Sequence, residues 1–180
     1  MGMARDPRLR SLLKGALRLA ACTAGAAVAM GLLLLFIDPP SAPLLVASFG
    51  GTAVFLFGLT GAPAAQPRSL LGGHLGGALV GILCFRAFGD ATWVYVLALV
   101  VTLAYMLLTG TVHPPAGANP LIMVHAHAGF GALLQPVGLG AALLLIVATI
   151  WSRITPGVVH YPCNWSQRSP PKPSLGGWVE

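Results

Sequence analysis

The chain has 180 residues, of which 56% are hydrophobic and only 8% are charged, and its mean hydropathy is +0.82. This composition excludes an ordinary soluble domain and indicates an integral membrane protein. A net charge of +6 could suggest a nucleic-acid-binding protein, but most Lys and Arg residues gather near the two ends of the chain, as a topology signal would.

Four stretches are apolar enough to cross a bilayer as helices, namely residues 17–37, 70–85, 93–108 and 137–151. The thickness of the hydrocarbon core requires roughly 20 residues in a helical span. The span must be helical because unpaired backbone groups cannot remain in hydrocarbon. Between them lie two shorter Gly-rich apolar stretches, which begin at Pro43 and Pro120. We therefore predict an all-α polytopic membrane domain over residues 17–160. A basic cytoplasmic segment, 1–16, precedes it, and a flexible segment rich in Pro, Ser and Gly, 161–180, follows it.

The membrane domain reads as two similar halves, over about residues 17–88 and 91–155. Each half has a span, an xPP break, a short Gly-rich helix, a Gln-Pro turn and a second span. The first half contains "DPPSAPLLV" and "QPRSLLGG", and the second contains "HPPAGANPLIMV" and "QPVGLGAA". Duplicated halves are common in transporters. The pattern predicts four long spans plus two short or re-entrant helices.

Two topologies fit this pattern. If the short helices cross the membrane, there are six segments and inverted halves, with DPP outside and HPP inside. If they re-enter, there are four spans and the halves are parallel. The positive-inside rule does not choose, because with the N-terminus inside both topologies leave nine of the ten Lys and Arg inside. Both place the two termini in the cytoplasm, and we expect a bacterial inner (plasma) membrane.

Three blocks of sequence carry a family resemblance: "SFGGTAVFLF" from Ser48, "AQPRSLLGGH" from Ala65 and "TVHPPAGANPLI" from Thr111. In this order, separated by apolar spans, they resemble the HPP family of integral membrane proteins over about residues 15–165. The resemblance implies a protein usually described with four transmembrane helices, whose plant plastid and cyanobacterial relatives are associated with nitrite transport. The chain departs from the family pattern at Gly51, where Ala is common, and at Ser69, where Asn is common.

We therefore expect a small-anion permease, with nitrite as its substrate and the lipid bilayer as its surroundings. An anion that leaves water needs donors, and helix N-termini supply free N–H groups with a favourable dipole. The "FGGT" segment from Phe49 to Thr52 and the "PPAGAN" turn before Pro120 are predicted to be such helix ends, meeting near the middle of the membrane. One alternative is a non-transporting membrane sensor or partner protein. A less favoured one is an intramembrane His-dependent enzyme, because the four acidic residues of the chain offer few acid or base partners for a catalytic His.

The predicted pathway residues are polar side chains or glycines of the three blocks: Ser48, Gly50, Gly51, Thr52, Gln66, Arg68, His74, His113 and Asn119. Several have a structural alternative. Arg68 could grip a planar oxyanion or anchor the helix at the interface. His113 could carry protons or merely bond carbonyls freed by the two prolines that follow. Gln66 and Asn119 could be helix caps, and His74 could bond a neighbouring helix.

No cofactor or metal is expected. His125 and His127 are two residues apart, so on a helix they point about 200° apart, and no Asp, Glu or Cys stands next to them. Glycines at 73, 77 and 81 predict a small-residue face for close helix packing, either within the chain or in a homo-oligomer. Arg86 and Asp90, four residues apart, are predicted to pair.

Overall fold

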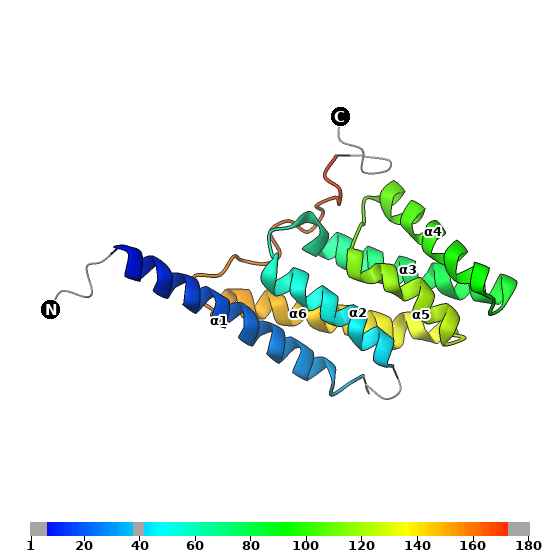
Figure 1. Cartoon of the computed structure of the whole chain (residues 1–180), viewed down its shortest axis with the longest axis horizontal. Coiled ribbons are helices and arrows are strands. Elements are labelled where there is room, and N and C mark those ends of the chain that lie inside the picture. The colour runs from blue at the N-terminus through cyan, green and yellow to red at the C-terminus, as the bar shows by residue number, and fades with distance from the viewer. Residues whose placement is uncertain (1–6, 38–41, 173–180) are drawn as a thin grey trace.

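The computed structural model describes residues 7–37 and 42–172, and this part of the chain is all-helical. The long helices are α1 (Pro7–Leu33), α3 (Pro67–Phe88), α4 (Thr92–Thr109) and α6 (Leu139–Ile154), and the short ones are α2 (Pro43–Ala53) and α5 (Asn119–His125) (Figure 1). Four helical segments are long and apolar enough to cross a membrane, and they coincide with the four predicted spans. The all-α polytopic prediction is confirmed.

The first short helix does not break at "FGGT". Residues Phe49 to Thr52 lie inside α2, which continues directly into a π-helical turn, Val54–Gly58. The predicted helix end at this position is therefore wrong. Each glycine lowers helix propensity by about 1 kcal/mol, but packing outweighs this cost. At Gly51 a Cβ would lie only 3.1 Å from Cβ of Pro115, so the glycine lets the two segments approach closely.

The break in the second half is where the sequence predicts it. α4 ends at Thr109, Gly110 adopts the left-handed conformation (φ 64°), and a 3-10 turn, Pro114–Ala118, leads into α5. Asn119, however, is not the cap of α5. Ala118 holds the N-cap position without a side-chain hydrogen bond, and the Asn119 amide instead bonds His74 on α3.

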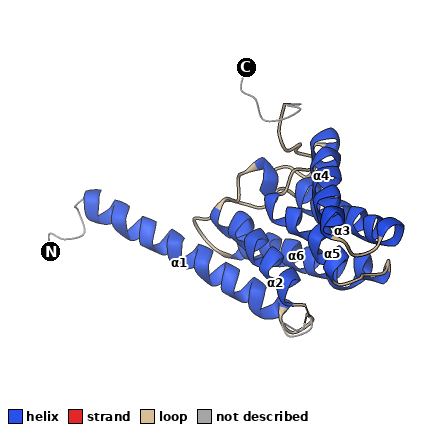
Figure 2. Ribbon diagram, turned by 45° about the vertical axis from the view of Figure 1, so that its right-hand side comes forward, coloured by secondary structure: helices blue, strands red, loops and turns tan. Residues whose placement is uncertain are grey.

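The helical segments run alternately between two ends of the bundle, which we name the Tyr161 end and the Asp90 end. Loops 59–66 and 110–113 meet the chain after α6 at the Tyr161 end, where the Tyr161 hydroxyl donates to the Ala65 carbonyl and the Val112 amide to Ser169. Turn 89–91 and loop 126–132 meet at the other end through Asp90 and His127. α2 returns antiparallel to α1 (Figures 1 and 2).

This alternation agrees with the six-segment topology, in which the short helices run from one end to the other. α2 with its π-helical turn passes from the start of α6, where Phe49 approaches Gly140, to the Tyr161 end, where Phe57 approaches Gly25. The Pro114–Ala118 turn and α5 together pass from loop 110–113 at the Tyr161 end to the Asp90 end, and Pro120 lies beside Gly77 in the middle of α3. The duplication of the two halves stays a prediction.

Glycines of α3 allow neighbouring segments to pack closely against it. Its glycines at 73, 77 and 81 face the Pro114–Ala118 turn and α5, and a Cβ on Gly81 would lie 2.5 Å from the Pro120 carbonyl oxygen. The predicted small-residue face is thus used within the chain.

The chain after α6 packs on the Tyr161 end. Composition places residues 161–172 in a flexible segment, but Tyr161 is fully buried there. The predictions for residues 1–6, 38–41 and 173–180 lie outside the described residues.

Candidate functional site

Five uncharged polar side chains meet inside the bundle, and we name them the polar cluster: Ser48, Thr52, His74, His113 and Asn119. α2 supplies the two hydroxyls, and α3 supplies His74. The HPP segment, which is residues 113–115, supplies His113, and α5 supplies Asn119. Each is between 0 and 5% exposed. All five were predicted as pathway residues, and the structure brings them together.

The bonds of the cluster form a chain through both imidazoles. The Thr52 hydroxyl oxygen lies 2.8 Å from Nε2 of His74 and 3.0 Å from Nε2 of His113. On the far side of His113, Nδ1 lies 2.6 Å from the Ala64 carbonyl oxygen. On the far side of His74, Nδ1 lies 2.9 Å from the Asn119 amide nitrogen. Thr52 is therefore the centre of the cluster.

Donor and acceptor chemistry fixes the direction of this chain. A carbonyl oxygen only accepts, so His113 carries a proton on Nδ1, and in the neutral imidazole Nε2 then offers a lone pair. An amide nitrogen only donates, so His74 accepts at Nδ1 and carries its proton on Nε2. Thr52 then accepts from His74 and donates to His113. Both imidazoles are neutral in this arrangement, and they are opposite tautomers.

The remaining polar atoms are also paired. The Ser48 hydroxyl lies 2.9 Å from the Pro115 carbonyl oxygen and 3.0 Å from Oδ1 of Asn119. The second N–H of the Asn119 amide donates to the His74 carbonyl oxygen at 3.0 Å. Among the described residues, the cluster therefore has no unpaired donor left for a ligand. A ligand could bind only if one of these bonds were exchanged.

Aromatic rings and a glycine hold the imidazoles in place. The Phe49 ring lies 5.0 Å from that of His74, the Phe55 ring meets His113 edge-on at 5.6 Å, and the two imidazole centroids are 5.1 Å apart. At Gly73 a Cβ would lie 2.9 Å from Cβ of His113, so only glycine allows this approach. Phe49 and Phe55 were not predicted, because an apolar ring in an apolar span carries no signal of its own.

The other predicted pathway residues lie outside the cluster. Gln66 is 1% exposed, and its amide donates to the carbonyls of Thr60 and Ala62 while its oxygen accepts from the backbone of the chain after α6. Its side chain makes no cap bond. Arg68 is exposed and donates to the Thr109 carbonyl at 2.7 Å. Gly50 has open space where a Cβ would be.

Two buried hydroxyls have no partner in the described part of the chain, Ser69 on α3 and Thr102 on α4. They are 0 and 1% exposed. Sequence reasoning did not single them out as site residues, because Ser and Thr in a helix normally bond the carbonyl one turn back. They remain the two polar side chains of the described core that a water or ligand could still satisfy.

The residues at the Asp90 end form a separate surface group. Nε2 of His127 lies 2.8 Å from Asp90, and this hydrogen bond lowers the pKa of the Asp90 carboxyl. Arg86 instead lies over the Phe130 ring, so the predicted Arg86–Asp90 pair is wrong. The loop after α5 places His127, rather than Arg86, beside the carboxylate. Within the described residues no group of three or more His, Cys, Asp or Glu could hold a metal.

Comparison with known proteins gives one family. The family described as "HPP, transmembrane region" matches residues 10–162. A transmembrane protein of Dictyostelium discoideum is 36% identical over 130 residues, which cover 68% of this chain and 45% of the relative. A second one from the same organism is 38% identical over 129 residues, with 67% and 41% covered. The chain thus spans less than half the length of these relatives. No solved structure matches.

Proposed function

Because this chain belongs to the HPP transmembrane-region family, we propose that it is a small-anion permease with nitrite as the first substrate to test. The polar cluster carries the proposal. Burying polar side chains among apolar helices is costly in a membrane, and such groups commonly line the path of an ion or proton. The cluster joins α2, α3 and the HPP segment, so a change at its centre affects all three.

Proton transfer to Nε2 of His113 is the exchange that would give the cluster a charge without breaking it. The proton comes from water on the side of uptake, and the Thr52 hydroxyl then turns from His113 to the Ser48 carbonyl oxygen, which is already 3.3 Å away. Thr52 keeps accepting from His74 and also accepts from the new N–H. Every atom of the cluster keeps a partner, and the site gains one positive charge.

A buried imidazolium needs a counter-charge, since an isolated charge in a low-dielectric interior costs several kcal/mol. Asp90 is the one acidic residue in the described part of the chain, and it lies on the surface with His127. An anion that arrives with the proton would supply the missing charge. One proton and one nitrite would cross together, with no net charge moved.

The approach to the cluster would run between α2 and the HPP segment. A pocket of about 590 Å³ is lined there by Ser48, Gly51 and Pro115, together with apolar residues of α2 and α5. Ser48 thus belongs to both the pocket and the cluster. Separating α2 from the Pro114–Ala118 turn would connect the two, because the Ser48 and Gly51 contacts with Pro115 close this boundary.

Uptake into liposomes tests this function. Nitrite uptake by liposomes holding the purified protein is compared with nitrate, formate and chloride uptake, with and without an inward proton gradient. We expect saturable nitrite uptake that the gradient accelerates. Thr52→Val and His113→Gln should lose it, and Thr52→Ser should keep it. Protein-free liposomes correct for nitrous acid that crosses unaided. Arg68→Lys, which keeps the charge but not the paired donors, tests the predicted role of that residue separately.

The outcomes separate the parts of the proposal. Nitrite uptake at the same rate with and without the proton gradient would contradict proton coupling but would agree with a permease. A folded wild type that takes up none of the anions would contradict the permease. The second candidate, a non-transporting membrane sensor or partner protein, would then be favoured, because the saturated hydrogen bonds of the cluster also suit a purely structural role. We propose no enzymatic reaction.

A further inference from the structure

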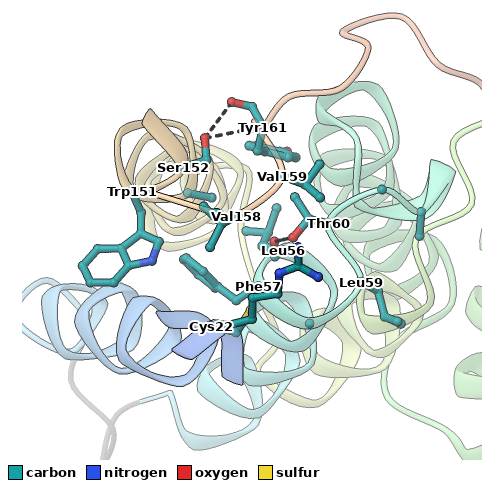
Figure 3. Close-up of a pocket in the computed structure, with 16 residues that line it drawn as sticks. Cys22, Leu56, Phe57, Leu59, Thr60, Trp151, Ser152, Val158, Val159 and Tyr161 are labelled. Atoms are coloured by element: carbon teal, nitrogen blue, oxygen red, sulfur yellow. Dashed lines mark hydrogen bonds between the residues drawn. The ribbon is translucent and has the colours of Figure 1, made fainter. Parts of the chain in front are cut away.

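A large pocket opens at the Tyr161 end, away from the polar cluster. It has a volume of about 650 Å³ and lies between α1, the π-helical turn after α2, the end of α6 and residues 157–161 (Figure 3). This volume is within the range of about 300–1,000 Å³ that small-ligand sites have. Its walls are mostly apolar, with Leu56, Phe57, Val158 and Val159 among them. A small inorganic anion would leave such a volume unfilled.

The hydroxyl and indole side chains that line this pocket are already hydrogen-bonded within the protein. The Thr60 hydroxyl donates to the Leu56 carbonyl at 2.7 Å, and the Trp151 indole N–H donates to Ala21 at 3.1 Å. The Ser152 hydroxyl bonds backbone groups of α6 and Tyr161. Arg18 is the charged residue that lines the pocket. The walls therefore suit a ligand with an apolar body and one anionic end.

α1 carries further positive charge toward this pocket. Lys14, Arg18 and Cys22 follow one another at four-residue spacing, which places them along one face of the helix, and the last two line the pocket. Further along the same face lie Gly25 and Ala29, of which Gly25 packs against Phe57. The basic side chains thus follow the side of α1 that contacts the bundle.

The length of α1 places these charges at headgroup level. Its 27 residues give about 40 Å of helix, roughly 10 Å more than the hydrocarbon core of a bilayer. The N-terminal part of α1 extends beyond the bundle (Figure 1), and Leu12, Leu13, Leu17 and Leu19 are more than half exposed. Such a helix end, apolar on one side and basic on the other, suits the boundary between lipid headgroups and chains.

We infer that this pocket binds an anionic membrane lipid, whose phosphate contacts Arg18 and Lys14 and whose acyl chain enters between α1 and residues 157–161. Charge complementarity and the apolar walls both select this ligand, because a zwitterionic lipid lacks the net charge and a soluble anion lacks the apolar body. This inference does not rest on the proposed anion transport, because it uses none of the residues of the polar cluster.

Cys22 gives a direct measure of occupancy, because its half-buried thiol lines the pocket. The exposed Cys163 is replaced by Ser, and the rate at which a water-soluble maleimide labels Cys22 is measured by peptide mass spectrometry in vesicles. Vesicles of phosphatidylcholine are compared with vesicles containing phosphatidylglycerol. We expect slower labelling with phosphatidylglycerol. We call this slowing of the Cys22 labelling rate protection. Arg18→Gln should weaken the protection about fivefold, because one basic residue near an anionic surface contributes about this factor to binding.

Arg153→Gln is the matched control, because Arg153 is exposed on α6 near the same end but does not line the pocket. It removes the same charge, so protection should remain. Arg18→Lys should restore most of the protection. Equal labelling in the two lipids would overturn the inference, as would equal loss of protection in the Arg18→Gln and Arg153→Gln variants, since only general surface charge would then matter.

Discussion

Replacing Thr52 by Val tests the hydrogen-bond chain at its centre. The substitution keeps the shape of the side chain but leaves the Nε2 donor of His74 and the Nε2 acceptor of His113 without a partner. Each buried group left unpaired costs about 1–3 kcal/mol, so the free energy of unfolding should fall by about 2–6 kcal/mol. Hydrogen bonds between membrane helices are often worth only about 0.6 kcal/mol, which places the effect toward the lower end.

Thr52→Ser is the matched control, because it keeps the hydroxyl and loses one buried methyl group, at a cost of about 1 kcal/mol. Unfolding in mixed micelles with increasing SDS, followed by far-UV circular dichroism, compares the two variants. Nitrogen-15 NMR of the imidazoles should show His113 protonated on Nδ1 and His74 on Nε2. If the Val variant were as stable as the Ser variant, or if both imidazoles were the same tautomer, the deduced chain would be incorrect.

Three further substitutions have expected outcomes. Gly81→Ala should destabilise the fold by about 1–3 kcal/mol in the same SDS assay, because its Cβ would meet the Pro120 backbone, and no loss would contradict this packing. Ser69→Ala removes a buried hydroxyl without a partner, so stability should stay equal or rise by about 1 kcal/mol, and a clear loss would reveal a missed partner. Asp90→Asn should lower the melting temperature at neutral pH and have no effect in acid. His127 lowers the pKa of Asp90 in the folded protein. The stabilisation by this pair is therefore present above the pKa that Asp90 has in the unfolded chain, and it is lost as pH falls through the pKa of the folded protein. A difference in melting temperature that does not change with pH would exclude this pair as its cause.

The spans and the second break could be predicted because they depend on local sequence. A bilayer requires long apolar helices, and Gly110 with the following prolines ends α4 wherever the rest of the chain lies. The continuity of α2 could not be predicted. Two adjacent glycines look like a break, and only the contact of Gly51 with Pro115, far away in the sequence, shows why the helix tolerates them.

The members of the polar cluster were predicted individually, and the two short segments were predicted to meet, but the contacts of both segments with His74 on α3 were not predicted. Polar residues in apolar stretches are conspicuous, so Thr52, His74 and His113 stand out from the sequence. Whether they touch depends on how α2, α3 and the HPP segment pack, and Gly73 sets that distance. The same chemistry also suggested Arg68, which instead bonds the end of α4. An Arg side chain offers the same charge and donors whether it bonds a helix end or binds an anion, so residue type alone cannot distinguish these two roles.

Loop 59–66 links the two sites. The Ala64 carbonyl accepts from His113, and the next carbonyl, of Ala65, accepts from the Tyr161 hydroxyl, which belongs to a residue that lines the pocket at that end. Gln66 then fixes this loop to the chain after α6. A shift of residues 157–161 around a bound lipid would therefore act on the Ala64 carbonyl, which holds the proton of His113 on Nδ1. Because the position of that proton decides whether Nε2 can accept another, the proposed lipid pocket lies where it could influence the polar cluster without touching it.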